Sequence, residues 1–279
     1  MTGDGESAGL SASPPISRRE LLRLCTAAAA GAGAAALAAC NSKDPVQYSA
    51  AAQAGVLLTR PAVPAQSVAP GLHPLGLGSG RDGVLYVPAG YDAGTPTPLA
   101  LLLHGATGSA SGIAEPFMPL ADGAGVILLV PDSRGRTWDR ITGSFGPDVA
   151  FIDQALAYAF ERCNVDAARV AAAGFSDGAS YALSLGMTNG ALLPRVVAFS
   201  PGFAAPGART GAPRFFITHG VSDTVLPIQQ CSRRIVPELR ALGYDVTYEE
   251  FDGGHEIPLE LATEGMRWVG REKGRLSAL

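Results

Sequence analysis

The chain has 279 residues, of which 47% are hydrophobic and 16% are charged. This length and apolar content suffice for one large α/β domain with a sizeable core, and they leave little room for a second. The formal net charge of −4 is modest and there is no run of basic residues, so nothing indicates nucleic-acid binding.

The first 39 residues are predicted to be an export signal. Arg18 and Arg19 precede an Ala/Gly-rich stretch, a pattern that resembles a twin-arginine signal. The stretch ends in Leu37-Ala38-Ala39-Cys40, which resembles a bacterial lipobox. Two alternatives are a transmembrane anchor, for which the stretch is short and weakly apolar, and an alanine-rich tail with a chance cysteine. We expect export to the bacterial cell envelope and a lipid anchor to the membrane at Cys40.

Residues 40–72 are rich in Ala, Pro, Gln and Ser without a sustained period, and we interpret them as a tether. Within them, Tyr48 to Leu58 could form a short ordered piece. The folded domain is expected to cover residues 73–279.

Strand and helix patterns alternate along this domain. Continuous apolar runs such as Leu99 to Leu103 and Val126 to Val130 predict strands buried on both faces. The alternation predicts a doubly wound, mostly parallel α/β sheet with ligands at the carboxyl ends of the strands. The expected strands are 82–88, 98–103, 125–130, 170–173, 195–200, 215–219 and 246–251. The expected helices are 112–122, 148–163, 179–187, a helix near 231–242, and 259–271.

A Gly-x-Ser-x-Gly pentapeptide, Gly174 to Gly178, lies between an expected strand and an expected helix. This context predicts a sharp turn that holds Ser176 in a strained conformation at the top of the sheet. The pentapeptide alone would equally suit a glycine-rich turn with a solvated serine.

A serine hydroxyl needs a base to take its proton and a third group to orient that base. His255 is the one histidine that follows both the serine and a plausible acid. Asp223, just after the 215–219 strand, is the favoured acid, with Asp245 and Asp252 as alternatives. Asp223 could instead cap a helix.

Acyl transfer also needs backbone N–H donors for the developing oxyanion. The donors expected here are the amide of Asp177, directly after the serine, and the amide of Ala106 in the turn that follows Leu103. Thr107 is the second choice for the latter. His104 is expected to support this turn structurally.

Four motifs together resemble the α/β-hydrolase superfamily, and most of all its compact esterases of the carboxylesterase, lysophospholipase and polyhydroxybutyrate-depolymerase type. They are His104-Gly-Ala-Thr-Gly108, Gly174-Phe-Ser-Asp-Gly178, His219-Gly-Val-Ser-Asp223 and Gly253-Gly-His255. The resemblance covers about residue 82 to the C-terminus. It implies Ser176 as nucleophile, His255 as general base and Asp223 as its orienting acid, with no metal and no cofactor.

Many lipases of this superfamily carry a cap domain between the strands expected at 195–200 and 215–219. Here only residues 201–214 separate them, so we expect no cap and an open site for soluble or extended esters. Trp138, Phe203 and Leu226 follow strand ends and could line the substrate pocket. Ordinary packing is the alternative for each.

Cys163 and Cys231 remain once the leader and Cys40 are set aside. They are expected near opposite edges of the sheet, about one strand length (roughly 17 Å) apart, which is too far for a disulfide. We predict two buried free thiols.

The leading hypothesis is therefore a serine carboxylic-ester hydrolase. A lysophospholipase or thioesterase of the same fold is the nearest alternative, and the triad by itself also admits acyl transferases and lyases. A non-catalytic binding protein with a hydrolase fold is the alternative from another class.

Overall fold

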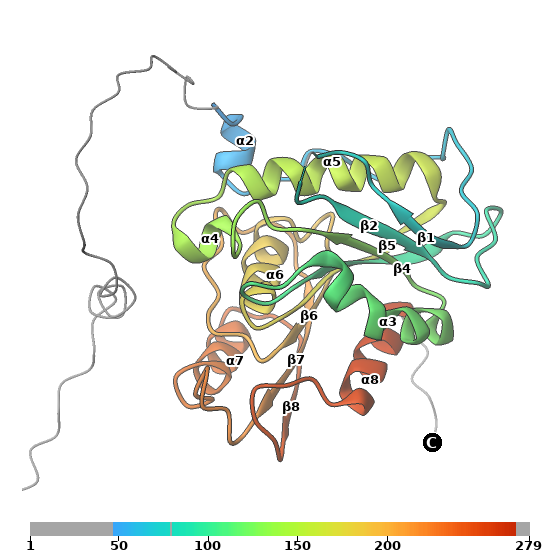
Figure 1. The fold of residues 1–279 in the computed structure, drawn as a ribbon. Coiled ribbons are helices and arrows are strands. Elements are labelled where there is room, and N and C mark those ends of the chain that lie inside the picture. The colour runs from blue at the N-terminus through green and yellow to red at the C-terminus, as the bar shows by residue number, and fades with distance from the viewer. Residues whose placement is uncertain (1–46, 79, 272–279) are drawn as a thin grey trace, which may run out of the picture. The chain divides into compact units, whose positions relative to one another are not determined.

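The apolar runs of the sequence become the central strands of one eight-stranded sheet (Figure 1). The structure is a computed structural model that describes residues 47–78 and 80–271. The predicted export signal and Cys40 lie outside the described residues. Every residue of strand β3 (Thr97–Leu103) is buried, as expected for a strand covered on both faces.

The strand order across the sheet is β1-β2-β4-β3-β5-β6-β7-β8. Neighbouring strands are parallel along β4-β3-β5-β6-β7-β8, whereas β2 pairs antiparallel with β4, and β1 pairs antiparallel with β2 at the edge. This confirms the predicted mostly parallel α/β sheet. The other strands are β1 (Gly71–Pro74), β2 (Gly83–Val87), β4 (Ile127–Pro131), β5 (Val165–Phe175), β6 (Arg195–Phe199), β7 (Arg214–Gly220) and β8 (Val246–Phe251).

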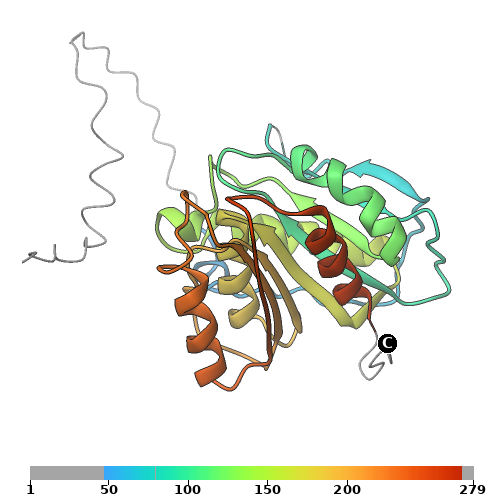
Figure 2. The same ribbon diagram turned by 90° about the horizontal axis from the view of Figure 1, so that it is seen from below.

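Helices cover both faces of the sheet (Figure 2). Helices α3 (Ala110–Ala124) and α8 (Leu259–Gly270) pack on one face, whereas α5 (Pro147–Arg162), α6 (Asp177–Thr188) and α7 (Ser232–Ala241) pack on the other. Successive side chains of β3 alternate between the two cores: Leu99, Leu101 and Leu103 belong to one, Ala100 and Leu102 to the other. Two short helices complete the fold, α2 (Ala50–Gln53) and α4 (Asp139–Thr142).

The tether prediction is wrong for residues 47–72, because this segment packs on the domain. Leu57 is completely buried, and its amide donates to the side-chain oxygen of Asn189 over 2.8 Å. The amides of Leu58 and Thr59 both donate to Asp153 on α5, each over 2.9 Å. These partners lie about a hundred residues away in the chain, so local sequence does not reveal them. The folded domain therefore begins before residue 73.

A ladder of hydroxyl groups fixes the segment between β6 and β7 against α6. Ser180, Ser184 and Thr188 lie four residues apart on one side of the helix, and each donates to the carbonyl four residues earlier. Each also accepts a backbone N–H from the segment, over 2.8–2.9 Å; the donors are Gly202, Ala205 and Gly207. As predicted, residues 201–213 form no cap domain.

Both cysteines of the described domain are buried free thiols, as predicted. Burial raises the pKa of Cys163 to about 12 and also raises that of Cys231. The two thiols are therefore protonated and unreactive near neutral pH.

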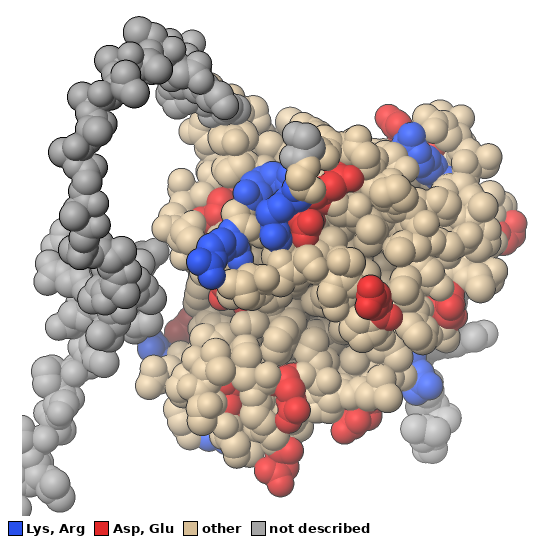
Figure 3. Space-filling view, viewed as in Figure 1, with Lys and Arg blue, Asp and Glu red and all other residues tan. Residues whose placement is uncertain are grey.

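Charged side chains are sparse on the face in Figure 3, where several Arg side chains gather in one cluster beside Asp and Glu side chains. The low charged fraction of the chain agrees with this. Within residues 47–78 and 80–271, no helix combines the length and the apolar character needed to cross a bilayer.

Candidate active site

Ser176 occupies a strained turn between β5 and α6. Its φ of 57° and ψ of −119° are rare for a residue with a side chain. The flanking glycines are needed because a Cβ on Gly174 would lie 2.4 Å from the carbonyl carbon of Gly178, and one on Gly178 would lie 2.1 Å from the carbonyl oxygen of Leu103. The turn therefore has the geometry of a nucleophile elbow at the carboxyl end of a central strand.

Loops after three parallel strands bring the predicted residues together. Nε2 of His255 lies 2.9 Å from Oγ of Ser176, and Nδ1 of His255 lies 2.6 Å from Oδ2 of Asp223. With the proton on Nδ1, the ring donates to Asp223 and accepts from the serine hydroxyl, a tautomer that we assign from this network. The ring of Phe175 lies against His255, with centroids 4.8 Å apart.

Asp223 is held as an anion by its own loop. Its Oδ1 accepts the amides of Val225 and Leu226, each over 2.8 Å. Burial raises the pKa of Asp223, but the hydrogen bonds from Leu226 and His255 outweigh this effect, and the net pKa lies below the ordinary value. Neither alternative acid has this position: Asp245 pairs with Arg214 over 2.8 Å, and Asp252 is exposed.

His219 supports this acid, a role the sequence analysis did not assign. The ring is completely buried, and Nε2 donates to the carbonyl of Leu226 over 2.8 Å while lying 3.2 Å from Oδ2 of Asp223. Nδ1 accepts from Ser232 over 2.7 Å. Burial lowers the pKa of His219, so the ring is neutral and acts as a fixed support for the Asp223 loop.

The turn that carries the predicted donor Ala106 lies against the serine, since a Cβ on Gly105 would be 3.4 Å from Cβ of Ser176. Thr107 cannot serve, because its amide already donates to the carbonyl of Arg136 over 2.7 Å. Within the part of the chain that the structure describes, the amides of Ala106 and Asp177 have no backbone acceptor outside the helices and strands. Ala106 is therefore the better candidate of the two turn residues, as the sequence suggested.

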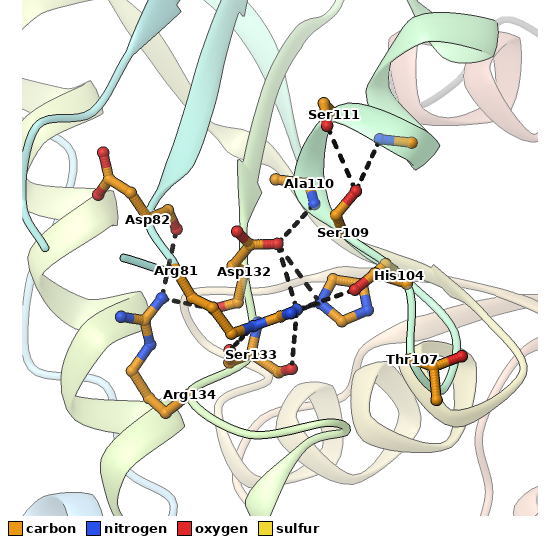
Figure 4. Close-up of polar contacts among 12 residues, drawn as sticks. Arg81, Asp82, His104, Thr107, Ser109, Ala110, Ser111, Asp132, Ser133 and Arg134 are labelled. Atoms are coloured by element: carbon orange, nitrogen blue, oxygen red, sulfur yellow. Dashed lines mark hydrogen bonds and ion pairs between the residues drawn. The ribbon is translucent and has the colours of Figure 1, made fainter. Parts of the chain in front are cut away.

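His104 lies buried beneath this turn, as Figure 4 shows. Its Nδ1 donates to the carbonyl of Gly105 over 2.7 Å, and its Nε2 accepts the amide of Ser133 over 3.0 Å. Arg81 lies beside the ring and donates to the carbonyl of Gly108 over 2.9 Å. Burial lowers the pKa of His104, so this histidine is a neutral support of the turn, as predicted.

The pocket prediction is wrong for Trp138. Its side chain is completely buried, stacks on Tyr181 and donates to the carbonyl of His104 over 2.8 Å. The residue follows a strand end, but its ring turns inward to fill the core. Phe203 and Leu226 are half-buried, and neither lines the cavity beside the oxyanion turn.

That cavity has a volume of about 470 Å³ and lies between residues 104–109 and the start of α3. Its remaining lining is almost entirely apolar and was not predicted: Gly112, Ile113, Pro116, Phe117, Phe175 and Ile257. Phe175 could have been suspected, since it directly precedes the serine. The α3 residues were predicted only as helical, and the sequence does not say which of them face a cavity.

The described residues contain no group of three His, Cys, Asp or Glu side chains that could hold a metal ion.

The sheet topology and the strained turn at Ser176 are those of the α/β-hydrolase fold. Residues 132–263 match the phospholipase/carboxylesterase family, and this range contains Ser176, Asp223 and His255. Feruloyl esterase C of Emericella nidulans is 30% identical over 159 residues, which are 54% of this chain and 57% of that enzyme. Probable feruloyl esterase C of Aspergillus niger is 28% identical over 169 residues, 58% of this chain and 60% of that protein. The matches thus span less than two thirds of these relatives.

Solved structures share the fold at low identity. Esterase PE8 is 22% identical, with a TM-score of 0.55, over 67% of this chain and 98% of that one. A ferulic acid esterase of Anaeromyces mucronatus is 20% identical, with a TM-score of 0.52, over 68% of this chain and 84% of that one. The Bacillus cereus carboxylesterase is 20% identical, with a TM-score of 0.52, over 68% of this chain and 94% of that one.

Proposed function

We propose that the protein is a serine hydrolase that cleaves carboxylic esters through an acyl-enzyme. The observation that carries the proposal is the continuous hydrogen-bond chain Ser176–His255–Asp223 at the end of a nucleophile elbow. The feruloyl esterase relatives and the phospholipase/carboxylesterase match support the same reaction class.

In this mechanism Nε2 of His255 takes the hydroxyl proton as Oγ of Ser176 attacks the ester carbonyl. Asp223 holds the imidazole in the reactive tautomer and stabilises the imidazolium. The amides of Ala106 and Asp177 bind the oxyanion of the tetrahedral intermediate. His255 then protonates the leaving alcohol, and a water molecule activated by the same ring hydrolyses the acyl-enzyme.

The apolar cavity beside the oxyanion turn supports an acyl group that is apolar or aromatic. Its volume of about 470 Å³ suits a small aromatic or medium aliphatic acyl chain. Feruloyl esterases by name act on esters of an aromatic acid, so feruloyl esters are the first substrates to test.

Fluorophosphonate labelling tests the proposed nucleophile. The wild-type protein should be labelled at one site and Ser176→Ala should not be; labelling that survives the substitution would remove Ser176 from its role. A protein that is never labelled and turns over no ester would be a binding protein with a hydrolase fold.

A lysophospholipase or thioesterase activity is the second candidate, because the matching family includes phospholipases. A panel of p-nitrophenyl esters of increasing chain length, methyl ferulate, a lysophosphatidylcholine and an acyl thioester separates these activities. The substrate with the highest kcat/KM identifies the class.

We also propose that the protein is an exported lipoprotein, on the strength of Arg18-Arg19 and the Leu37–Cys40 motif. Labelled palmitate should enter the wild-type protein and leave Cys40→Ala unlabelled and outside the membrane fraction. Equal labelling of both proteins would refute lipidation at Cys40.

A further inference from the structure

Asp148 is an almost completely buried carboxylate in the first turn of α5, 1% exposed, and the proposed mechanism does not use it. Its Oδ1 accepts the amide of Arg134 over 2.5 Å, and its Oδ2 accepts the amide of Asp139 over 2.6 Å. One side chain thus holds both ends of the loop 134–139.

Asp139 completes the clamp from the other direction. Its Oδ2 accepts the amides of Gly146 and Asp148 over 2.8 and 2.9 Å, and its Oδ1 accepts the hydroxyl of Tyr181 over 3.0 Å. The loop and the start of α5 are therefore joined by two reciprocal carboxylates and anchored to the core.

Three consecutive residues inside the clamped loop contact both segments that carry the candidate oxyanion amides. The carbonyl of Arg136 accepts the amide of Thr107, which follows Ala106. The hydroxyl of Thr137 donates to the carboxylate of Asp177 over 2.6 Å, and the indole of Trp138 donates to the carbonyl of His104. The loop spans the distance between the oxyanion turn and the start of α6.

We propose that Asp148 is a positioning residue of the oxyanion hole: by clamping the loop 134–139 it holds the amides of Ala106 and Asp177 at the spacing that the tetrahedral intermediate needs. This inference rests on the proposed function, because it assigns Asp148 a role in the same site. It adds a residue that touches neither the substrate nor the triad.

Protonation of Asp148 would release one end of the clamp, since a carboxylic acid has one acceptor fewer to offer the two amides. The charged and titratable groups that face it are Arg134 and Asp139, with Tyr181 behind Asp139. Burial raises the pKa of Asp148 to about 6, so the clamp would open in a range where esterases are assayed.

Asp148→Asn is the variant to test, because it keeps the size of the side chain and one carbonyl acceptor. Asp153→Asn is the matched control: Asp153 lies on the same helix and accepts two backbone amides, but those of Leu58 and Thr59. With p-nitrophenyl acetate, kcat of Asp148→Asn should fall about tenfold or more with KM almost unchanged, part of the roughly hundredfold that losing one oxyanion donor costs. Asp153→Asn should keep the wild-type kcat.

The pH profile gives a readout that a merely structural role would not move. On the acid side, kcat/KM of the wild type should fall more steeply than that of Asp148→Asn, by up to about tenfold more between about pH 7 and pH 5, as Asp148 takes a proton. A kcat within about twofold of wild type, or an acid limb equally steep in both proteins, would overturn the proposal.

The rate of fluorophosphonate labelling separates this proposal from the proposed function. If the wild type is labelled at Ser176 but Asp148→Asn is labelled equally fast, the clamp is refuted and the esterase proposal stands. If the wild type is not labelled at all, both proposals fail.

Discussion

The amide of Thr107 donates to the carbonyl of Arg136 over 2.7 Å, whereas that of the preceding Ala106 has no backbone acceptor outside the helices and strands of the described chain. Thr107 itself has a φ of 60°, so the contact holds the turn in a conformation that a threonine rarely adopts. The loop 134–139 thereby occupies the amide of Thr107 and leaves that of Ala106 as the candidate donor of the turn.

Replacing Ala106 by proline removes the backbone N–H and still leaves a small apolar side chain at this position. We expect Ala106→Pro to lower kcat about a hundredfold or more with a small change in KM, because the donor acts chiefly in the transition state. Ala106→Gly retains the amide and should keep at least about half of the wild-type kcat. Steady-state kinetics on p-nitrophenyl acetate, with melting curves to verify folding, test this; equal losses in the two variants would contradict an oxyanion role.

Asp223→Asn should keep the fold, but it should no longer hold His255 in the reactive tautomer. The side-chain carbonyl of this variant can still accept the backbone N–H groups of the loop. It cannot stabilise the imidazolium of His255, and kcat should therefore fall on the order of 10⁴-fold. Because the pKa of Asp223 lies below its ordinary value, the carboxylate stays ionised between about pH 6 and 9. The loss should therefore be the same throughout that range.

Asp245→Asn is the control for this variant. Asp245 was an alternative acid in the sequence, but its side chain is 63% exposed and pairs with Arg214. Its substitution should leave kcat unchanged. A loss at Asp245 comparable to that at Asp223 would mean that the geometry of the acid is misassigned.

The hydroxyl ladder on α6 makes a prediction about stability. Ser184 is completely buried, and Ser184→Ala leaves the amide of Ala205 without its acceptor, so the free energy of unfolding should fall by about 1–3 kcal/mol. Thr263→Ala on α8 is the control, since Thr263 makes the same bond to the carbonyl four residues earlier, but there the bond is exposed to solvent. Urea denaturation measures both, and hydrogen exchange at Ala205 should accelerate only in the first; an equal effect of both variants would refute the ladder.

The sequence was enough to predict the parallel sheet and the positions of Ser176, Asp223 and His255. Continuous apolar runs of this length indicate buried strands. The order Ser, acid, His along the chain leaves few combinations of residues that could form a triad. It was not enough to predict the packing of residues 47–72, because their hydrogen bonds go to Asn189 and Asp153, far along the chain.

The inward turn of Trp138 and the Asp139–Asp148 clamp were missed for a related reason. A residue that follows a strand end can point into the site or into the core, and local sequence does not distinguish these directions. Buried carboxylates satisfied by backbone amides carry no sequence pattern of their own. Both features become visible only when the loop and the start of α5 are placed together.

The raised pKa of Asp148 makes stability and activity respond to pH in opposite directions. Its pKa is about 6 in the folded protein against an ordinary value of 3.8, so the folded state binds the proton more tightly than the unfolded chain. The resulting stabilisation is complete below about pH 4 and is lost as the pH rises through 6; it amounts to about 3 kcal/mol. The clamp, by contrast, needs the ionised carboxylate.

The difference in free energy of unfolding between wild type and Asp148→Asn measures this effect, because titrating groups that do not interact with Asp148 cancel and only Asp148 and its neighbour Asp139 contribute. Between pH 4 and 7 the wild type should lose up to about 3 kcal/mol relative to the variant, measured by urea denaturation at four or more pH values. The same difference for Asp153→Asn should stay flat over this range. If the Asp148→Asn difference is also flat, Asp148 does not change its ionisation between pH 4 and 7, and the acid limb of the activity profile has another origin.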